Sequence, residues 1–303
     1  MADRSRPMLL LWLILSTMAC GSPQRETKPL RVGFVPAEDA QQVIQNAQPI
    51  VDLLQTRLEM EVQPFVATDY TGVVEALRVH KLDIAFLTPA SYVLAKSEAN
   101  VRVVLKSERR GSPFYYAAII TRADSGIKKL EDLRGKTFAF GDPLSTSANV
   151  FPRKMFHERG IDPVRDFKQI LYSGGHDATV LAVLNRKVDA GATYANSPDS
   201  HDAAWTRCLK DPEDIKRIRA IAYSEPIPAD NLVINASLDD RLAKKVEEVF
   251  LELSRDEKGK KMLRHLYQID GFVPATDKDY DSVREAFAIA GIQVKEALQK
   301  KQP

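Results

Sequence analysis

The sequence predicts an α/β protein of two lobes with a ligand cleft between them. Three observations lead to this prediction. Apolar, β-branched runs alternate with helical patterns over most of the chain, which favours mainly parallel sheets. Ten such runs are many for one open sheet, so two sheets of about five strands fit better. Two breaks in the pattern, near residues 111–125 and 224–231, indicate where the chain crosses between the lobes and forms a hinge.

The strand-like runs follow one another along the chain with helical patterns between the early ones. They are residues 30–36, 61–67, 84–88, 101–107, 115–122, 137–142, 167–174, 190–194, 218–224 and 231–237. From Leu238 onward the pattern is helical only, with a last helix expected from about Asp279 to Lys300. With crossings at the two breaks, the first lobe is predicted to comprise residues 28–113 plus 225–303, and the second lobe residues 114–224.

Composition and charge exclude some function classes. The chain has 303 residues, with 43 basic and 41 acidic side chains and a net charge of +2. Because no basic stripe alternates with aromatic residues, a nucleic-acid partner is not expected. The five histidines are scattered and no Cys/His cluster has zinc spacing. We therefore expect neither a metal site nor a cofactor.

The first twenty residues have the layout of a secretory signal. Two arginines precede an apolar run at residues 8–15, which small residues follow up to Cys20. This run is too short to span a membrane. A cysteine directly after the small residues is typical of a lipoprotein signal, in which Cys20 is acylated and becomes the first mature residue. Residues 21–29 would then form a flexible tether.

Two positions depart from the usual lipoprotein pattern. Thr17 stands where leucine is commonest, and Met18 where a small residue is preferred. Plain export and a retained anchor therefore stay open as alternatives. If Cys20 is acylated, Cys208 has no partner within the chain and no disulfide framework is expected. Cys208 lies on an apparent helix, where a half-buried thiol is the simplest interpretation.

The stretch GDPLSTSANVFPR, residues 141–153, places three hydroxyls between a strand-like and a helix-like run. A single helix cap needs only one of Ser145, Thr146 and Ser147. A strand leading into a helix N-terminus is also where α/β proteins bind anions. No basic residue follows before Arg153, so an anion would be held by hydroxyls and the helix dipole rather than by a salt bridge. Helix cap and anion site are both open at this point.

Pro152 predicts that this turn is irregular. A helix that begins at Ser147 would lose a backbone hydrogen bond at Pro152 or bend there. We therefore expect the regular helix to start near Asn149.

Several segments together resemble the periplasmic phosphonate/phosphite/phosphate-binding proteins of ABC importers. They are RVGFVP, DYTGVVEALRVHKLDIAFLTPASYVLA, the stretch from YYAAIITR to STSANVFPR, YSGGHDATVLAVLNRK and EPIPADNLVIN, within residues 30–270. Ser-Thr-Ser followed by Gly-Gly-His-Asp is the most specific part. The resemblance implies a type II periplasmic-binding-protein fold that closes over a small oxyanion, an ABC permease and ATPase complex as partner, and a location in the cell envelope.

The resemblance also implies which residues form the ligand shell. The hydroxyls of Ser145, Thr146 and Ser147, which we call the donor turn, would bind the phosphorus oxyanion. Two tyrosines would close on it from the first lobe, and a histidine and an aspartate would complete the shell. Tyr116 would face the other side of its strand, so its neighbour is the expected ligand residue. The predicted shell is Tyr70, Tyr115, Ser145, Thr146, Ser147, His176 and Asp230.

Asp230 indicates what kind of anion is bound. A carboxylate repels an anion unless the ligand carries a proton that it can accept, and no arginine in the donor turn compensates its charge. Asp230 therefore suits a protonated oxyanion and rejects sulfate. Residues 194–197 carry no carboxylate, which argues for a ligand without an amine: phosphate, phosphite, hypophosphite or methylphosphonate. The region around Glu38 and Asp39 could nevertheless supply charge.

Two other classes of function compete with a transport receptor. A hydrolase would use Ser147, His176 and either Asp189 or Asp230, but the chain has no G-x-S-x-G elbow, and three adjacent hydroxyls suit a donor array better than one nucleophile. We therefore do not expect an enzyme. A lipoprotein that presents its ligand to an envelope sensor protein would have the same ligand shell, so this alternative stays open. We expect a monomer.

Overall fold

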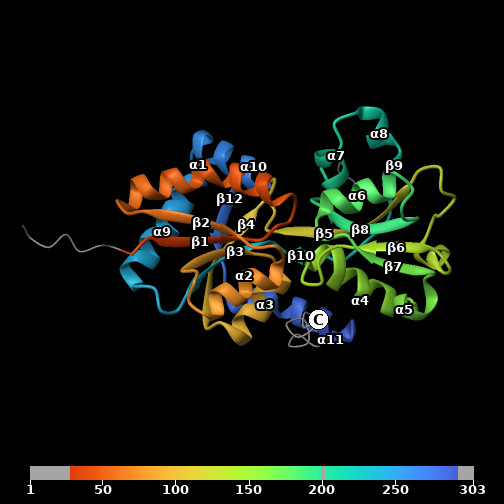
Figure 1. Ribbon diagram of the computed structural model, residues 1–303, viewed down its shortest axis with the longest axis horizontal. Helices are drawn as coiled ribbons and strands as arrows, with labels where there is room; N and C mark the ends of the chain where they lie inside the picture. The colour runs from red at the N-terminus through yellow and green to blue at the C-terminus, as the bar shows by residue number, and fades with distance from the viewer. Residues whose placement is uncertain (1–27, 199–201, 293–303) are drawn as a thin grey trace, which may run out of the picture.

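The computed structural model describes residues 28–198 and 202–292 (Figure 1). Two six-stranded sheets lie side by side, each with helices on both faces. We call the sheet that contains the first strand of the chain, with its helices, the first lobe, and the other sheet with its helices the second lobe.

The first sheet combines parallel and antiparallel strands. In sheet order its strands are β12 (Gly271–Pro274), β4 (Val101–Glu108), β11 (Asn231–Asn235), β3 (Ile84–Leu87), β1 (Leu30–Phe34) and β2 (Val62–Val66). Strand β1 pairs in parallel with β2 and β3, whereas β11 is antiparallel to both β3 and β4.

The second sheet is also mixed. Its strands are β10 (Ile227–Pro228), β5 (Phe114–Arg122), β8 (Ala190–Ala195), β6 (Thr137–Phe140) and β7 (Gln169–Tyr172), with β9 (Ile218–Tyr223) paired to β5. Strand β6 is parallel to β7 and β8, and β5 is antiparallel to β8, β9 and β10. The prediction of mainly parallel sheets is therefore wrong. The strand that follows each crossing, β5 in the second sheet and β11 in the first, runs opposite to its neighbours β8 and β3. These reversed strands account for most of the antiparallel pairs.

Helices of the two lobes lie above and below the sheets (Figure 1). Those of the first lobe are α1 (Ala40–Leu58), α2 (Tyr70–Arg78), α3 (Pro89–Glu98), α9 (Asp240–Leu253), α10 (Glu257–Tyr267), η3 (Asp277–Tyr280) and α11 (Asp281–Ile289). Those of the second lobe are η1 (Leu130–Leu133), η2 (Thr146–Val150), α4 (Phe151–Glu158), α5 (Pro163–Asp166), α6 (His176–Leu184), α7 (Ala204–Cys208) and α8 (Pro212–Lys216).

All ten strands expected from the sequence are present. Strands β10 and β12 were not predicted, because each is short and ends in a proline, which weakens the strand signal. The last helix, α11, ends at Ile289, because the chain turns at Gly291 with φ +64°, so the expectation of one helix running from Asp279 through these residues to Lys300 is wrong at residues 290–292. The expected positions beyond residue 292 lie outside the described residues. Within the described ranges, no helix combines the length and apolarity that crossing a membrane requires.

The hydrophobic core continues from one lobe into the other. Separate clusters fill the space between the first sheet and helices α1, α9 and α10, and between the second sheet and helices α6 and α7. A third cluster lies below both sheets and includes residues of α2, α3, α4 and α11. Helix α11 packs against α3 of the first lobe and α4 of the second. The two lobes are therefore joined by packing of helices as well as by the chain crossings.

The chain crosses between the sheets twice, at residues 109–113 and 229–230. The two crossing segments are hydrogen-bonded, since Ala229 N donates to Pro113 O (2.9 Å) and Ser107 N donates to Asp230 O (2.8 Å). Residues on these segments therefore lie beside each other although about 120 positions separate them.

The donor turn is irregular, as Pro152 predicts. Residues Thr146–Val150 form one π-helical turn, and the regular helix α4 starts at Phe151, two residues later than expected. Pro152 thus falls in the first turn of α4, where its missing N–H removes no helical hydrogen bond.

Candidate functional site

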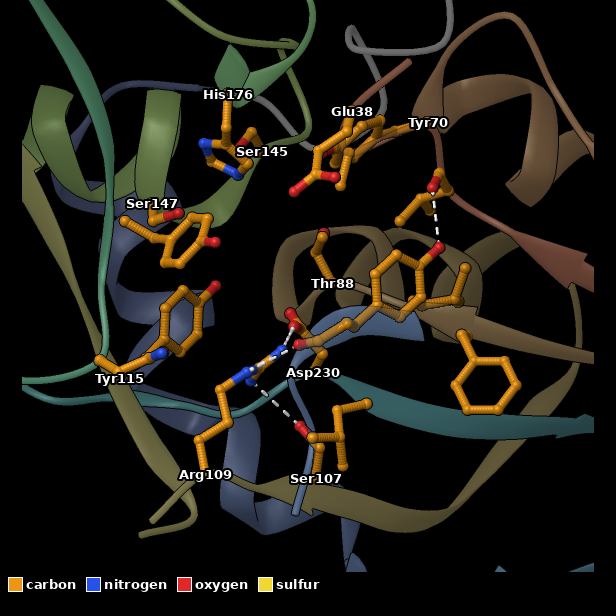
Figure 2. A pocket seen from close by; sticks show the side chains of 18 of the residues that line it. Glu38, Tyr70, Thr88, Ser107, Arg109, Tyr115, Ser145, Ser147, His176 and Asp230 are labelled. Carbon is orange, nitrogen blue, oxygen red and sulfur yellow. Dashed lines mark hydrogen bonds and ion pairs between the residues drawn. The ribbon is translucent and has the colours of Figure 1, made fainter. Parts of the chain in front are cut away.

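A cavity of about 60 Å³ lies between the two lobes (Figure 2). A cavity that holds one water occupies roughly 10–15 Å³ by this measure, so there is space for about five water-sized groups. That is the size of a tetrahedral oxyanion with at most a small substituent. Of the seven predicted ligand residues, six line the cavity: Tyr70, Tyr115, Ser145, Ser147, His176 and Asp230.

Four helix N-termini meet at this cavity. Helix α2 begins at Tyr70, Thr88 caps α3, Ser145 caps the donor turn, and α6 begins at His176. All four residues line the cavity. Because the N-terminal end of a helix carries a partial positive charge, this arrangement favours an anion without any charged side chain.

The three hydroxyls of the donor turn have different roles. Ser145 Oγ accepts a hydrogen bond from Ala148 N (3.2 Å), so it serves as the helix cap. Thr146 is fully buried and does not line the cavity, because its hydroxyl accepts a hydrogen bond from Ala90 N of the first lobe (2.9 Å). Ser147 lines the cavity. Cap and candidate anion donor are thus both present, two positions apart in the same turn.

Tyr70 and Tyr115 each place a buried hydroxyl at the cavity. The Tyr70 hydroxyl has no hydrogen-bond partner within the described part of the chain, although buried hydroxyls are normally paired. The Tyr115 hydroxyl interacts with the hydroxyls of Thr146 and Ser147. Burial raises the pKa of both phenols above the usual range, so both stay protonated and can donate.

Only one of these tyrosines comes from the first lobe. Tyr70 does, but Tyr115 belongs to β5 of the second sheet, so the expectation that both close from the first lobe is wrong for Tyr115. The crossing ends at Pro113, and Tyr115 has therefore already entered the second sheet. Tyr116, its neighbour on β5, is not among the residues that line the cavity.

His176 is a neutral side chain at the wall of the cavity. Its Nδ1 lies 3.0 Å from Thr193 Oγ1, and the ring of Tyr194 contacts it edge-on. When Nδ1 accepts a hydrogen bond from the Thr193 hydroxyl, Nε2 carries the ring proton and is free to donate a hydrogen bond. Burial, with the nearby positive charges of Arg207 and Arg109, lowers the pKa of His176 to about 4. His176 is therefore a neutral donor at physiological pH.

Asp230 forms an ion pair that the sequence does not predict. Arg109 NH2 lies 2.9 Å from Asp230 Oδ2, and the same guanidinium donates to Ser107 Oγ and Tyr267 O (Figure 2). No arginine of the donor turn compensates Asp230, but Arg109, from outside that turn, does, and the sequence argument did not consider it. Arg109 and Asp230 lie on the two crossing segments, which are adjacent in space. The presence of opposite charges near the two predicted crossings could therefore have indicated this pair.

A second ion pair joins the lobes at the cavity. Glu38 of the first lobe and Arg207 on α7 are 2.7 Å apart, and both line the cavity. Burial raises the pKa of Glu38, and Arg207 opposes this shift. The other charged residues at the cavity are Arg109 and Asp230, so its charges cancel in two pairs.

Asn196 is a further polar residue at the cavity that was not predicted. It directly follows β8 and is 8% exposed, and neither atom of its amide has a hydrogen-bond partner in the described ranges. Its position after a strand that ends at the cleft was the available signal. Part of the cavity wall is apolar and belongs to the core, including Phe86, Ile269 and Phe272.

The arrangement does not assemble a catalytic triad. Asp189 is held by Thr137, whose backbone N and hydroxyl both donate to Asp189 Oδ2 at 2.8 Å, and it does not line the cavity. His176 Nδ1 faces Thr193, where a triad requires a carboxylate. The geometry supports hydrogen bonding to an anion rather than activation of a serine.

His176→Gln is expected to reduce the loss of stability in acid. In the unfolded chain the histidine titrates near its usual pKa of 6.5, whereas in the folded state its pKa is about 4. Below pH 6.5 the unfolded state therefore gains a proton that the folded state excludes, and stability falls by about 2 kcal/mol by pH 5. Because glutamine does not titrate, the variant lacks this part of the loss of stability. Denaturant unfolding at pH 7.5 and pH 5 measures it, with the exposed His157→Gln as control. Equal losses in wild type and His176→Gln would contradict the neutral state of His176.

Comparison with known proteins gives consistent matches over both lobes. A family model described as the phosphonate periplasmic substrate-binding protein of ABC transporters matches residues 32–280. The phosphate-import protein PhnD of Mycolicibacterium smegmatis is 29% identical over 297 residues, which cover 91% of this chain and 89% of that protein. The phosphonates-binding periplasmic protein of Escherichia coli is 29% identical over 248 residues, or 80% of this chain and 71% of that protein.

A solved structure agrees with these sequence matches. The binding-protein component of an ABC phosphonate transporter from Pseudomonas aeruginosa superimposes with a TM-score of 0.79 at 27% identity, covering 88% of this chain and 87% of that one. The predicted two-lobed fold is thereby confirmed.

Proposed function

The chain belongs to the family of phosphonate-binding periplasmic proteins of ABC transporters, and we propose that it captures one small phosphorus oxyanion and delivers it to an ABC permease and ATPase complex. The proposed ligand is phosphate, phosphite, hypophosphite or methylphosphonate. Because the charges at the cavity are already paired, the ligand would be held by neutral hydroxyls, the His176 N–H and helix N-termini.

The observation that carries this proposal is the unpaired Tyr70 hydroxyl beside the donor turn. A buried donor without a partner is unfavourable by about 1–3 kcal/mol unless a ligand accepts its hydrogen bond. In the same cavity, Ser147, Tyr115 and His176 offer further donors. A compact anion with three or four oxygens could accept from all of them at once.

Calorimetric titration of residues 21–303, the chain without the expected signal and lipidation site, tests the proposal. Phosphate, phosphite, hypophosphite and methylphosphonate would be titrated separately, with sulfate as the control anion. We expect at least one phosphorus oxyanion to bind with one site per chain. Absence of binding by all four would contradict the proposed function.

Ser147→Ala is expected to weaken binding of the best phosphorus ligand about tenfold or more. A hydrogen bond to a charged ligand contributes about 1.5–3 kcal/mol, and alanine removes the hydroxyl with little effect on the fold. Thr146→Ala should also weaken binding, because it removes the contact with Ala90 that joins the lobes. Titration measures both, with the exposed Ser97→Ala as control. If both variants bind every phosphorus oxyanion as the wild type does, the site lies elsewhere.

We also propose that the protein is exported and anchored by acylation of Cys20, which lies outside the described residues. Each buried CH₂ of an acyl chain contributes about 0.8 kcal/mol to membrane binding. We expect Cys20→Ser to lose labelling by a fatty-acid analogue and to give either a larger, unacylated precursor or a soluble product. A wild-type protein that is cleaved elsewhere and carries no label would exclude the lipoprotein.

The sequence places the lobes proposed to move at residues 28–113 plus 225–303 and residues 114–224. Because β10 (Ile227–Pro228) pairs with β5 of the second sheet, we place the second boundary at residues 229–230 instead of at 225. In the structure they contact each other across the cleft, for example through His176 N and Ala37 O (3.0 Å). Release of the ligand to the permease requires these contacts to open. Small-angle scattering should show a larger radius of gyration without ligand than with it; equal values would argue against hinge closure.

A further inference from the structure

Glu38 and Arg207 separate two hollows of very different size. They line the cavity of about 60 Å³ between the lobes and also a groove of about 520 Å³ on its outer side. The groove lies among α1, α6, α7 and α10, and exposed residues such as Gln42, Leu181 and Arg264 line it. The side chains of Glu38 and Arg207 thus stand between the ligand cavity and a space that is open to solvent.

The pair has a defined geometry. Arg207 Nε lies 2.7 Å from Glu38 Oε1, and Arg207 NH2 donates to Glu38 Oε2 at 3.3 Å, so the contact is two-pronged and directional. The two side chains are only 16% and 18% exposed, with arginine the less exposed. Figure 2 shows the Glu38 side chain directed into the cavity.

The backbone of the second lobe closely approaches the segment that carries Glu38. A Cβ added to Gly175 would lie 3.4 Å from Ala37 O and 3.5 Å from the Cα of Glu38. The chain of the second lobe therefore lies directly against the chain that carries Glu38. Since Glu38 and Arg207 come from different lobes, their contact forms only when the lobes are together.

Another part of the cavity wall consists of core side chains and cannot give way in the same manner. Val35, Phe86, Ile269 and Phe272 are 1–4% exposed and belong to the core of the protein. Closely packed core side chains resist displacement, whereas an ion pair at a solvent boundary can separate into water.

We propose that the Glu38–Arg207 pair is the wall that limits the size of the ligand, and that a phosphonate with a longer substituent can enter the outer groove only where this wall is removed. The inference rests on the proposed function, because it concerns the same cavity. Since the pair has no net charge, it closes the cavity without attracting or repelling the anion. A methyl substituent fits inside the wall, and a chain of four carbons does not.

Titration of methylphosphonate and n-butylphosphonate tests the proposal. We expect the wild type to bind methylphosphonate at least a hundredfold more tightly than n-butylphosphonate. In Glu38→Ala/Arg207→Ala, which removes the wall without changing the net charge, this ratio should fall at least tenfold through tighter binding of n-butylphosphonate. Glu38→Gln/Arg207→Gln is the matched control, because it removes the charges and keeps most of the volume. It should retain the wild-type preference.

The outcomes separate this inference from the proposed function. The proposal that this ion pair limits ligand size is contradicted if the wild type binds methylphosphonate and n-butylphosphonate equally well, or if Glu38→Ala/Arg207→Ala leaves the ratio of affinities unchanged. Binding of a phosphorus oxyanion would stand in either case. If Glu38→Gln/Arg207→Gln gains as much affinity for n-butylphosphonate as Glu38→Ala/Arg207→Ala, the charges of the pair and not its volume set the preference. This result would also contradict the proposal. If the wild type binds none of these ligands and also no phosphate, phosphite or hypophosphite, both proposals fail.

Discussion

Arg109→Met is expected to weaken binding of the phosphorus ligand about a hundredfold or more. In the wild type the Arg109 guanidinium is paired with Asp230 and makes two further hydrogen bonds, to Ser107 and Tyr267. Methionine keeps most of the volume and removes the charge. Asp230 is then left at the cavity as a negative charge without a counter-charge, facing an anionic ligand. Like charges brought together in a site unfavourably change the free energy by several kcal/mol, which corresponds to at least this loss of affinity.

The same change is expected to destabilise the unliganded protein, because Arg109 is buried and removal of one partner leaves the other unpaired. Arg109→Met/Asp230→Asn separates the two effects. With both charges gone, binding should recover by at least tenfold relative to Arg109→Met alone, as measured by calorimetric titration. If the double variant binds no better than the single one, Arg109 acts through the fold of the crossing segments and not through the charge of Asp230.

The fold could be predicted largely from local sequence patterns. Each of the ten expected strands is a run of β-branched and apolar residues, and each is a strand in the structure. The pattern works because β-branched and apolar side chains are the ones that pack well on a buried sheet face. The direction of the strands could not be predicted in this way. Whether β11 lies beside β3 in parallel or antiparallel depends on the path of the chain through the two crossings, and no residue of Asn231–Asn235 records that path.

The site was predictable where one motif holds several ligand residues and not where distant residues meet. Ser145 and Ser147 are neighbours in one turn, and the motif indicates the turn. Arg109 and Asp230 are 121 positions apart, and only the adjacency of the two crossing segments makes them partners. Glu38 and Arg207 are 169 positions apart and meet only across the closed cleft. Pairing of this kind depends on tertiary structure, so composition and spacing cannot reveal it.

The ion pair changes the argument about selectivity but not its direction. In the wild type, Arg109 binds Asp230 Oδ2, and Oδ1 has no hydrogen-bond donor among the residues that the structure describes. Oδ1 can therefore accept a hydrogen bond from a protonated ligand oxygen, such as the P–OH of phosphate, phosphite or methylphosphonate. Sulfate has no proton to donate at neutral pH, so its oxygen and Oδ1 would repel each other.

Asp230→Asn is accordingly expected to narrow the preference for the phosphorus ligand over sulfate by about a hundredfold or more. Asparagine keeps the size of the side chain and removes its repulsion of sulfate. It also adds an N–H that can donate a hydrogen bond to a sulfate oxygen. It also frees the positive charge of Arg109, which favours sulfate further, whereas the phosphorus ligand loses the acceptor for its proton. Each contribution is worth a few kcal/mol in a partly buried site, and both act in the same direction. Calorimetric titration of wild type and variant with the best phosphorus ligand and with sulfate gives the ratio of affinities. An unchanged ratio would mean that Asp230 holds the crossing segments through Arg109 and does not read the protonation state of the ligand.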